Sequence, residues 1–264
     1  MKRFFIGLMV LSLVLGVPPM AVFADSEGLA MAGNGTAGDP YIVTTLDQLD
    51  EVRGNLTAHY RLGADIDASA TAGWDGGAGW MPIGERGSGD SSKQFTGVLD
   101  GAGHVIRNLT INRPSQDGVG LFGMIGTGGM VRDLGMEGGT ITGGTSTGAL
   151  AGNNNGTIEQ SHAGVDVWGS GVVGGLVGYE YGQILASYAT GNVSGTNNVG
   201  GLVGRSDGTV TESYATGHVE GNDTVGGLIG LKEGGELSRS YFAGTVHGSG
   251  NYIGGLVGYL SGGI

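Results

Sequence analysis

Three tyrosines recur at one position of a repeated segment and are the residues best suited to contact a ligand. Tyr188, Tyr214 and Tyr241 are separated by 26 and 27 residues. In a stack of β-strands, such a period places them one above another, about 4.8 Å apart. A surface column of aromatic rings can bind sugars by apolar stacking, or it can hold the repeats in register without binding anything. The sequence leaves both interpretations open.

A second candidate region is the one irregular stretch of the chain, where Trp74 and Trp80 stand among charged residues. Aromatic rings beside polar groups can bind sugars, so both tryptophans are candidate ligand-binding residues. The same stretch contains Glu85, Arg86 and Asp90. A glycoside hydrolase needs two carboxyl groups about 5–10 Å apart. Convergence of these residues with another carboxylate in a groove would therefore indicate an enzyme.

Patterns for metals and cofactors are weak. Asp65 and Asp67 could place carboxylate oxygens on one strand face and bind calcium, although a polar strand edge gives the same pattern. The five histidines are scattered, and the chain has no cysteine. We therefore expect neither a metal site nor a cofactor.

Signatures of catalysis and nucleotide binding are also missing. The sequence contains no Gly-Lys-Ser/Thr P-loop and no His-Glu-x-x-His segment. Its formal net charge is −12, and it becomes −14 if a leader containing Lys2 and Arg3 is removed, because two cations are lost. An acidic chain binds nucleic acid poorly. We therefore predict no enzymatic activity and no nucleic-acid partner.

The elements that must position these residues follow from the glycine content and from a repeat. Glycine supplies 60 of 264 residues. That content argues against helical bundles, since each interior glycine costs about 1 kcal/mol. Two apolar columns and one serine column return at steps of 25–29 residues. Their members are Ile106, Val131, Ile158, Ile184, Val210, Leu237 and Ile264; Leu121, Leu150, Leu176, Leu202, Leu228 and Leu256; and Ser161, Ser187, Ser213 and Ser240.

Three columns with one period predict a β-solenoid of about 26 residues per coil. In one coil, alternation places Ser213, Ala215 and Val219 toward the core, and Tyr214 and Glu220 outward. The glycines are expected to supply corners with positive φ. A leucine-rich repeat fits less well, because helical and strand patterns do not alternate.

The chain begins with the features of a secretory signal peptide at residues 1–24. A basic start is followed by a short apolar run and by Val22-Phe23-Ala24, a small-x-small cleavage pattern. We expect cleavage after Ala24, a linker at residues 25–37, and no transmembrane span. The mature chain is then expected outside the cell or on its surface.

The rest of the chain divides into an N-terminal capping region at residues 38–111 and a repeat array at residues 112–264. Residues 46–52 are expected to form a short helix that covers the first coil, because a solenoid needs its end covered. Ile264 falls on the core position of a further coil. We therefore expect the array to be truncated at its C-terminus, or to be covered there by further chain.

The repeated Gly-Gly-Leu-Val-Gly phrase, preceded by Ser-Tyr-Ala-Thr-Gly, resembles the GLUG motif of bacterial secreted and surface proteins. The resemblance covers residues 38–264. It implies a right-handed parallel β-helix, pectate-lyase-like or filamentous-haemagglutinin-like, as in adhesin-like proteins and beside the catalytic domain of some IgA-cleaving zinc peptidases. Because the zinc peptidase signature is missing here, the resemblance implies no peptidase activity.

The prediction for function is a secreted or cell-surface, non-enzymatic β-helix module, adhesin-like or a spacer. Its expected partners are extracellular glycans, or the surface of a host or neighbouring cell. A carbohydrate-active enzyme on the same fold, lyase or hydrolase, is an alternative that rests on fold analogy. A calcium-binding or ice-binding solenoid is a second alternative. Thr190 and Thr216 align as in ice binders, but Gly164 and Ala243 interrupt that column.

Overall fold

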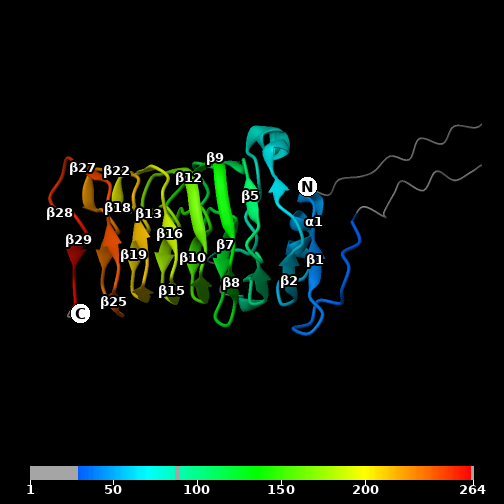
Figure 1. Ribbon diagram of the computed structural model, residues 1–264. Coiled ribbons are helices and arrows are strands. Elements are labelled where there is room, and N and C mark those ends of the chain that lie inside the picture. The colour runs from blue at the N-terminus through cyan, green and yellow to red at the C-terminus, as the bar shows by residue number, and fades with distance from the viewer. Residues whose placement is uncertain (1–28, 87–89, 263–264) are drawn as a thin grey trace, which may run out of the picture.

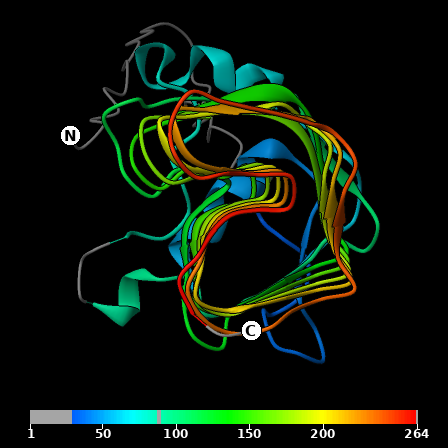
Figure 2. The ribbon, with the colours of Figure 1, turned by 90° about the vertical axis from the view of Figure 1, so that its left-hand side faces the viewer.

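The computed structural model describes residues 29–86 and 90–262, so the predicted signal peptide at residues 1–24 lies outside the described residues. The chain winds into an all-parallel β-solenoid of about six turns with about 27 residues per turn. Figure 1 shows the strands stacked along a rod, and Figure 2 shows the coils superposed when viewed along it. The predicted fold class is confirmed.

Four parallel sheets run along the rod and form its walls. The first sheet contains β1 (Tyr41–Val43), β2 (His59–Leu62), β4 (Val98–Asp100), β8 (Met130–Arg132), β11 (Thr157–Glu159), β15 (Gln183–Leu185), β20 (Thr209–Thr211) and β25 (Leu237–Ser238). The second sheet contains β7 (Phe122–Ile125), β10 (Ala151–Asn154), β14 (Val177–Glu180), β19 (Val203–Ser206), β24 (Ile229–Lys232) and β29 (Val257–Leu260).

The third sheet carries the predicted tyrosine column, and the fourth is the shortest. The third contains β3 (Ile66–Asp67), β5 (Val105–Arg107), β6 (Thr110–Asn112), β9 (Gly135–Gly143), β12 (His162–Gly169), β16 (Tyr188–Ala189), β17 (Val193–Ser194), β21 (Tyr214–Ala215), β22 (His218–Gly221), β26 (Tyr241–Phe242) and β27 (Thr245–Gly248). The fourth contains β13 (Val173–Gly174), β18 (Asn197–Gly200), β23 (Asp223–Gly226) and β28 (Ile253–Gly254).

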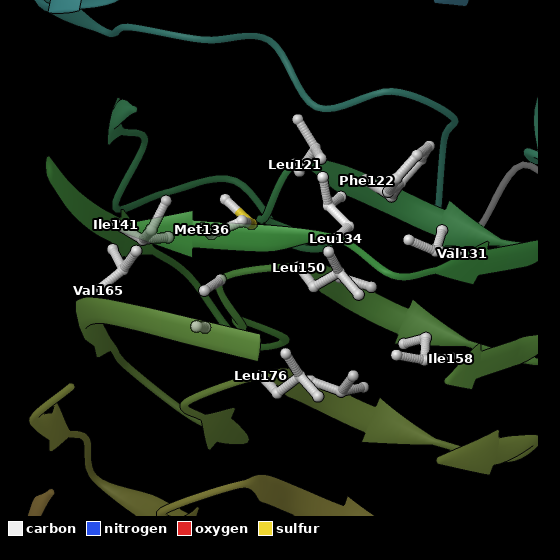
Figure 3. Close-up of a cluster of buried hydrophobic side chains, with 14 of the residues drawn as sticks. Leu121, Phe122, Val131, Leu134, Met136, Ile141, Leu150, Ile158, Val165 and Leu176 are labelled. Atoms are coloured by element: carbon white, nitrogen blue, oxygen red, sulfur yellow. The ribbon is translucent and has the colours of Figure 1, made fainter. Parts of the chain in front are cut away.

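The apolar columns form one continuous core. Leu121, Leu150 and Leu176 lie one above another, and each is fully buried (Figure 3). The predicted facing is also confirmed, because Ala215 is buried and Glu220 is exposed. Stacking equivalent strands thus buries one face of every strand and pairs its backbone with the coils on either side.

The prediction for Ile106 was wrong. The residue that pairs with Val131 in the first sheet is Leu99, 32 residues earlier, whereas Ile106 pairs with Met136 in the third sheet. The coil before Val131 is longer than the repeat, so extending a period of 26 backwards reached the wrong strand.

Glycines in the Gly-Gly-Leu-Val-Gly phrase serve close packing of the backbone and not the corners. A Cβ on Gly174 would lie 2.0 Å from the carbonyl oxygen of Val177, and one on Gly178 would lie 2.6 Å from the nitrogen of Thr147. Neither glycine has positive φ. The left-handed corners between the first and third sheets, with φ between 48° and 53°, are formed by non-glycine residues: Asp133, Gln160, Ala186, Glu212 and Arg239.

The serine column forms a ladder beside these corners. Ser187 Oγ accepts a hydrogen bond from the nitrogen of Ser161 at 3.1 Å and donates one to the carbonyl oxygen of Leu185 at 2.8 Å. In the next coil, Ser213 Oγ accepts a hydrogen bond from the nitrogen of Ser187 and donates one to the carbonyl oxygen of Thr211. Each serine therefore satisfies backbone groups of two successive coils, which stabilises the corner.

Helices occur mainly in the N-terminal region. They are α1 (Leu46–Glu51) and the 3₁₀ helices η1 (Val52–Gly54), η2 (Ser69–Gly77) and η3 (Ser91–Lys93). Thr45 caps α1, since its Oγ accepts a hydrogen bond from the nitrogen of Gln48 at 3.2 Å. Leu49 and Val52 are fully buried, and α1 lies at the N-terminal end of the rod (Figure 1).

The apolar columns become exposed in the last described coil. Ile253 and Leu256 are 40% and 39% exposed, whereas Val225 and Leu228, one coil earlier, are fully buried. The difference arises because no described coil follows.

Candidate ligand-binding sites

The predicted tyrosine column is a stacked ladder. The ring centroids of Tyr188 and Tyr214 are 4.8 Å apart with an interplanar angle of 5°, and those of Tyr214 and Tyr241 are 5.0 Å apart at 7°. His162, which was not among the candidate residues, extends the ladder by stacking on Tyr188 at 4.8 Å. Burial, followed by the neighbouring tyrosines, raises the pKa of Tyr214.

The inner rings of the ladder, Tyr188 and Tyr214, expose ring edges and not ring faces. Both faces of Tyr188 and Tyr214 are covered by the rings above and below, and both residues are only partly exposed. Tyr241, at 53% exposure, ends the series. A sugar that stacks on an aromatic face would have to displace a neighbouring ring. The geometry therefore suits register between coils better than ligand contact.

Trp74 and Trp80 form a different arrangement in the N-terminal region. Their ring centroids are 5.9 Å apart at an angle of 24°. Trp80 is fully buried, and its Nε1 donates a hydrogen bond to the carbonyl oxygen of Leu121 at 3.1 Å. Trp74 is half-buried and lines a hollow of about 650 Å³. Trp80 thus supports Trp74 from inside, and only Trp74 is placed to contact a ligand.

Charged groups surround this hollow. Arg113 donates to the carbonyl oxygen of Trp80 at 2.9 Å and to Asp75 Oδ2 at 2.8 Å. Arg53 lies 5.1 Å from the centroid of the Trp80 ring and donates to Asp50 Oδ1 at 3.0 Å. The remaining lining residues are Asp47, Gly79 and Met81. One aromatic side chain with carboxylates and guanidinium groups around it offers an apolar surface and polar groups in the same hollow.

The three charged residues that could have formed a catalytic group make separate contacts. Glu85 Oε2 accepts a hydrogen bond from Lys93 Nζ at 2.9 Å, and Arg86 lies 3.8 Å from Asp117. Asp90 Oδ1 accepts hydrogen bonds from the side chain and backbone of Ser92, which lower the pKa of Asp90. Glu85 and Arg86 nevertheless line one hollow of about 500 Å³ together with the carboxylate of Asp117, whereas Asp90 does not line it, so part of the arrangement that the hydrolase alternative requires is present.

One segment, residues 144–148, fits the Gly-x-Ser-x-Gly pattern of serine hydrolases. That pattern needs its serine exposed on a turn between a strand and a helix. Here Ser146 is fully buried, its Oγ is 3.4 Å from Asn153 Oδ1, and the next element is β10. The segment is therefore part of the solenoid wall and does not form a nucleophile elbow.

Asp65 and Asp67 already have hydrogen-bond donors, so they are poorly placed to bind calcium. Asp65 accepts from the nitrogen of Val105 at 3.1 Å and from Arg107 at 3.1 Å, and it lies 3.1 Å from His104 Nδ1. Asp67 accepts from Ser69 and Asn108. These hydrogen bonds lower the pKa of both carboxyls. Among the described residues, no group of three or more His, Asp or Glu side chains could hold a metal.

A buried polar column was missed by the sequence analysis. Asn154, Glu180, Ser206 and Lys232 pair in successive coils of the second sheet. Asn154 Nδ2 donates to Glu180 Oε2 at 2.8 Å, and Lys232 Nζ donates to the carbonyl oxygen of Gly208 at 2.7 Å. Burial raises the pKa of Glu180 well above its usual value and lowers that of Lys232. The four residues lie in strands whose sequences mix polar and apolar residues without regular alternation. The sequence therefore did not predict that these side chains are buried.

Comparison with known protein families identifies the class to which this architecture corresponds. Residues 195–220 match the family described as the GLUG motif. The matched segment contains β18, β19, β20 and β21. The chain is therefore a β-solenoid that carries the GLUG motif, as the repeated phrase predicted.

Two curated relatives match about half of the chain. Halomucin of Haloquadratum walsbyi is 41% identical over 145 residues, which are 52% of this chain and 2% of halomucin. A protein of Evansella cellulosilytica, named as a Gly-rich membrane protein, is 41% identical over 141 residues, which are 52% of this chain and 16% of that protein. The chain thus spans only a small part of the length of either relative.

A solved structure shares the fold. A crystal structure of an immunoglobulin A1 protease-like protein from Bacteroides ovatus superposes with a TM-score of 0.51 and 21% identity, covering 87% of this chain and 79% of that one. At this identity the likeness concerns the fold alone. Within residues 29–86 and 90–262, no helix is both long enough and apolar enough to span a bilayer.

Proposed function

We propose that the chain is a non-enzymatic module of a secreted or cell-surface protein and that it binds glycans in the hollow beside Trp74. The observation that carries this proposal is the pairing of Trp74 with the buried Trp80 at the edge of a hollow of about 650 Å³. One ring is anchored in the core, and the other is left beside open space with carboxylates and arginines around it.

The location outside the cell is supported from two sides. The relatives that match half of this chain are named halomucin and a Gly-rich membrane protein. The first 24 residues have the composition of a secretory leader.

Expression in a bacterial host should yield exported protein whose N-terminus is Asp25. Recovery of exported chain that still begins at Met1 would contradict the predicted cleavage.

The glycan proposal is tested by titration calorimetry with a panel of hexasaccharides: cellohexaose, chitohexaose, maltohexaose and the acidic hexagalacturonate. We expect at least one of them to bind the wild-type chain, Trp74→Ala to weaken binding about tenfold or more, and Trp74→Phe to retain most of it. The Phe variant is the matched control because it keeps an aromatic face.

Product analysis separates binding from catalysis. We expect the hexasaccharide that binds to be recovered intact after long incubation, because Asp50 and Asp75 are paired with Arg53 and Arg113. Shortened products that disappear in Asp47→Asn would instead establish a glycoside hydrolase.

A further inference from the structure

The third tryptophan of the described chain, Trp168, lies on the outer face of the third sheet, two coils along the array from β6, the strand that packs on the helix η2 of Trp74. It belongs to β12 and is 48% exposed. Its neighbours in the same column are Thr142 in the preceding coil and Ser194 in the following coil. Both are small, and among the described residues no ring stacks on Trp168, in contrast to the tyrosine ladder on the same sheet.

Two hollows meet at this side chain. One of about 220 Å³ lies toward the preceding coil, and one of about 370 Å³ lies toward the following coils. Trp168 and Ser194 line both of them, so the two hollows adjoin at the indole, and we refer to them together as the depression. None of the residues that line it lines the hollow at Trp74.

The polar groups in the depression are held in fixed orientations. Asp166 Oδ1 accepts a hydrogen bond from the nitrogen of Asn192 at 2.8 Å, and Asn192 Oδ1 accepts one from the nitrogen of His218 at 3.2 Å. In the part of the chain that the structure describes, Asp166 Oδ2 and Asn192 Nδ2 have no hydrogen-bond partner. One acceptor and one amide donor are thus oriented by the backbone and left available to a ligand.

The charge of the depression restricts the ligand. Asp166 and Glu220 contribute carboxylates, and the only basic group in the lining is the imidazole of His247. The remaining polar lining residues, Thr140, Thr142, Ser194, Asn222 and Ser249, carry hydroxyl and amide groups. A negatively charged ligand would be repelled by the two carboxylates, while a neutral ligand rich in hydroxyls would find both donors and acceptors.

We propose that Trp168 and its two flanking hollows form a second saccharide-binding site, which takes a neutral oligosaccharide lying along the rod. One sugar ring stacks on the indole, and the hydroxyls of the rings on either side bond to Asp166 and Asn192 in one hollow and to Glu220 in the other. The proposal extends the glycan-binding function proposed above to a separate site, and it rests on that function only for the class of ligand.

The test is calorimetric titration of the full chain with the same hexasaccharide panel, with thermal melts to verify folding. We expect two sites per chain, and loss of one of them in Trp168→Ala through a decrease in affinity of about tenfold. Trp168→Phe should retain binding within about threefold. Asp166→Asn removes one of the two carboxylates, so it should increase the affinity for hexagalacturonate without lowering the melting temperature.

The outcomes separate this site from the one at Trp74. If Trp168→Ala binds every neutral hexasaccharide with unchanged affinity and stoichiometry while Trp74→Ala loses binding, the second site is wrong and the proposed function stands. If only Trp168→Ala loses binding, the second site stands and the assignment to Trp74 is wrong. A wild-type chain that binds no member of the panel overturns both, and preference for hexagalacturonate at Trp168 overturns the ligand class.

Discussion

The tyrosine ladder of the repeat array and the tryptophan pair of the N-terminal region use aromatic side chains in opposite ways. In the array, four rings stack face to face with centroids 4.8–5.0 Å apart, those of His162, Tyr188, Tyr214 and Tyr241. Each ring therefore contacts the ring of the next coil. In the N-terminal region, Trp74 rests on one buried ring and borders a hollow. Regular repetition fills ring faces and stabilises the rod, whereas a break in the repeat leaves a face available for binding.

The largest expected effect concerns the core of the array. Leu202→Asp should destabilise the fold by several kcal/mol, because an unpaired carboxylate would enter a fully buried column. Thr216→Asp, in the next coil but facing outward, should change stability by no more than about 0.5 kcal/mol. Chemical denaturation of the two variants measures this difference. Equal losses would show that the inward and outward faces are assigned wrongly.

The glycine phrase provides a matched pair for the second prediction. Gly201→Ala should cost about 1–3 kcal/mol, because its Cβ would lie 2.3 Å from the carbonyl oxygen of Gly227. Gly255 occupies the same position of the phrase in the last described coil, and a Cβ there would have nothing within 4 Å. Gly255→Ala should therefore be nearly neutral in denaturation experiments. A similar cost for both would mean that the glycines serve torsional freedom and not close approach.

The buried polar column predicts a pH dependence specific to the array. The pKa of Glu180 is raised by burial, so its contribution to stability is fully present below about pH 4.5, its ordinary value, and is lost as the pH rises through the higher value in the folded chain. Glu180→Gln should therefore melt at a temperature similar to wild type near pH 4.5 and at a higher temperature than wild type at pH 8. Glu212→Gln, at an exposed ion pair, is the control. A difference that does not grow with pH would contradict the raised pKa.

A smaller effect is expected from the ladder itself. Tyr214 stacks on two rings and Tyr241 on one. Each stacked pair is worth about 1 kcal/mol. Tyr214→Ala should therefore reduce stability by about twice as much as Tyr241→Ala in thermal or chemical melts. If the two variants are equally stable, the ladder does not contribute to register.

How much of this structure the sequence predicts differs between the two regions. In the array, the column at Leu121 to Leu256 follows from the period of the repeat, and the inward-facing Ala215 follows from the alternation of residues along its strand. Near the N-terminus the coil length changes, so the same period misplaced Ile106. Glu180 and Lys232 were missed because charged residues are ordinarily expected at the surface, and here burial depends on pairing across coils. Trp168 does not recur with the period of the repeat. It is a candidate site only because the structure places small residues and two hollows beside it.

The central proposal is that a ring covered on one face only, such as Trp74, binds a saccharide and that a ring covered on both faces, such as Tyr214, does not. It is tested most directly by comparing the dissociation constants of Trp74→Ala and Tyr214→Ala for the hexasaccharide that binds the wild-type chain most tightly. The account predicts that Trp74→Ala weakens binding about tenfold or more and that Tyr214→Ala, once folded, leaves the affinity unchanged. Loss of binding in Tyr214→Ala with full affinity in Trp74→Ala would contradict it.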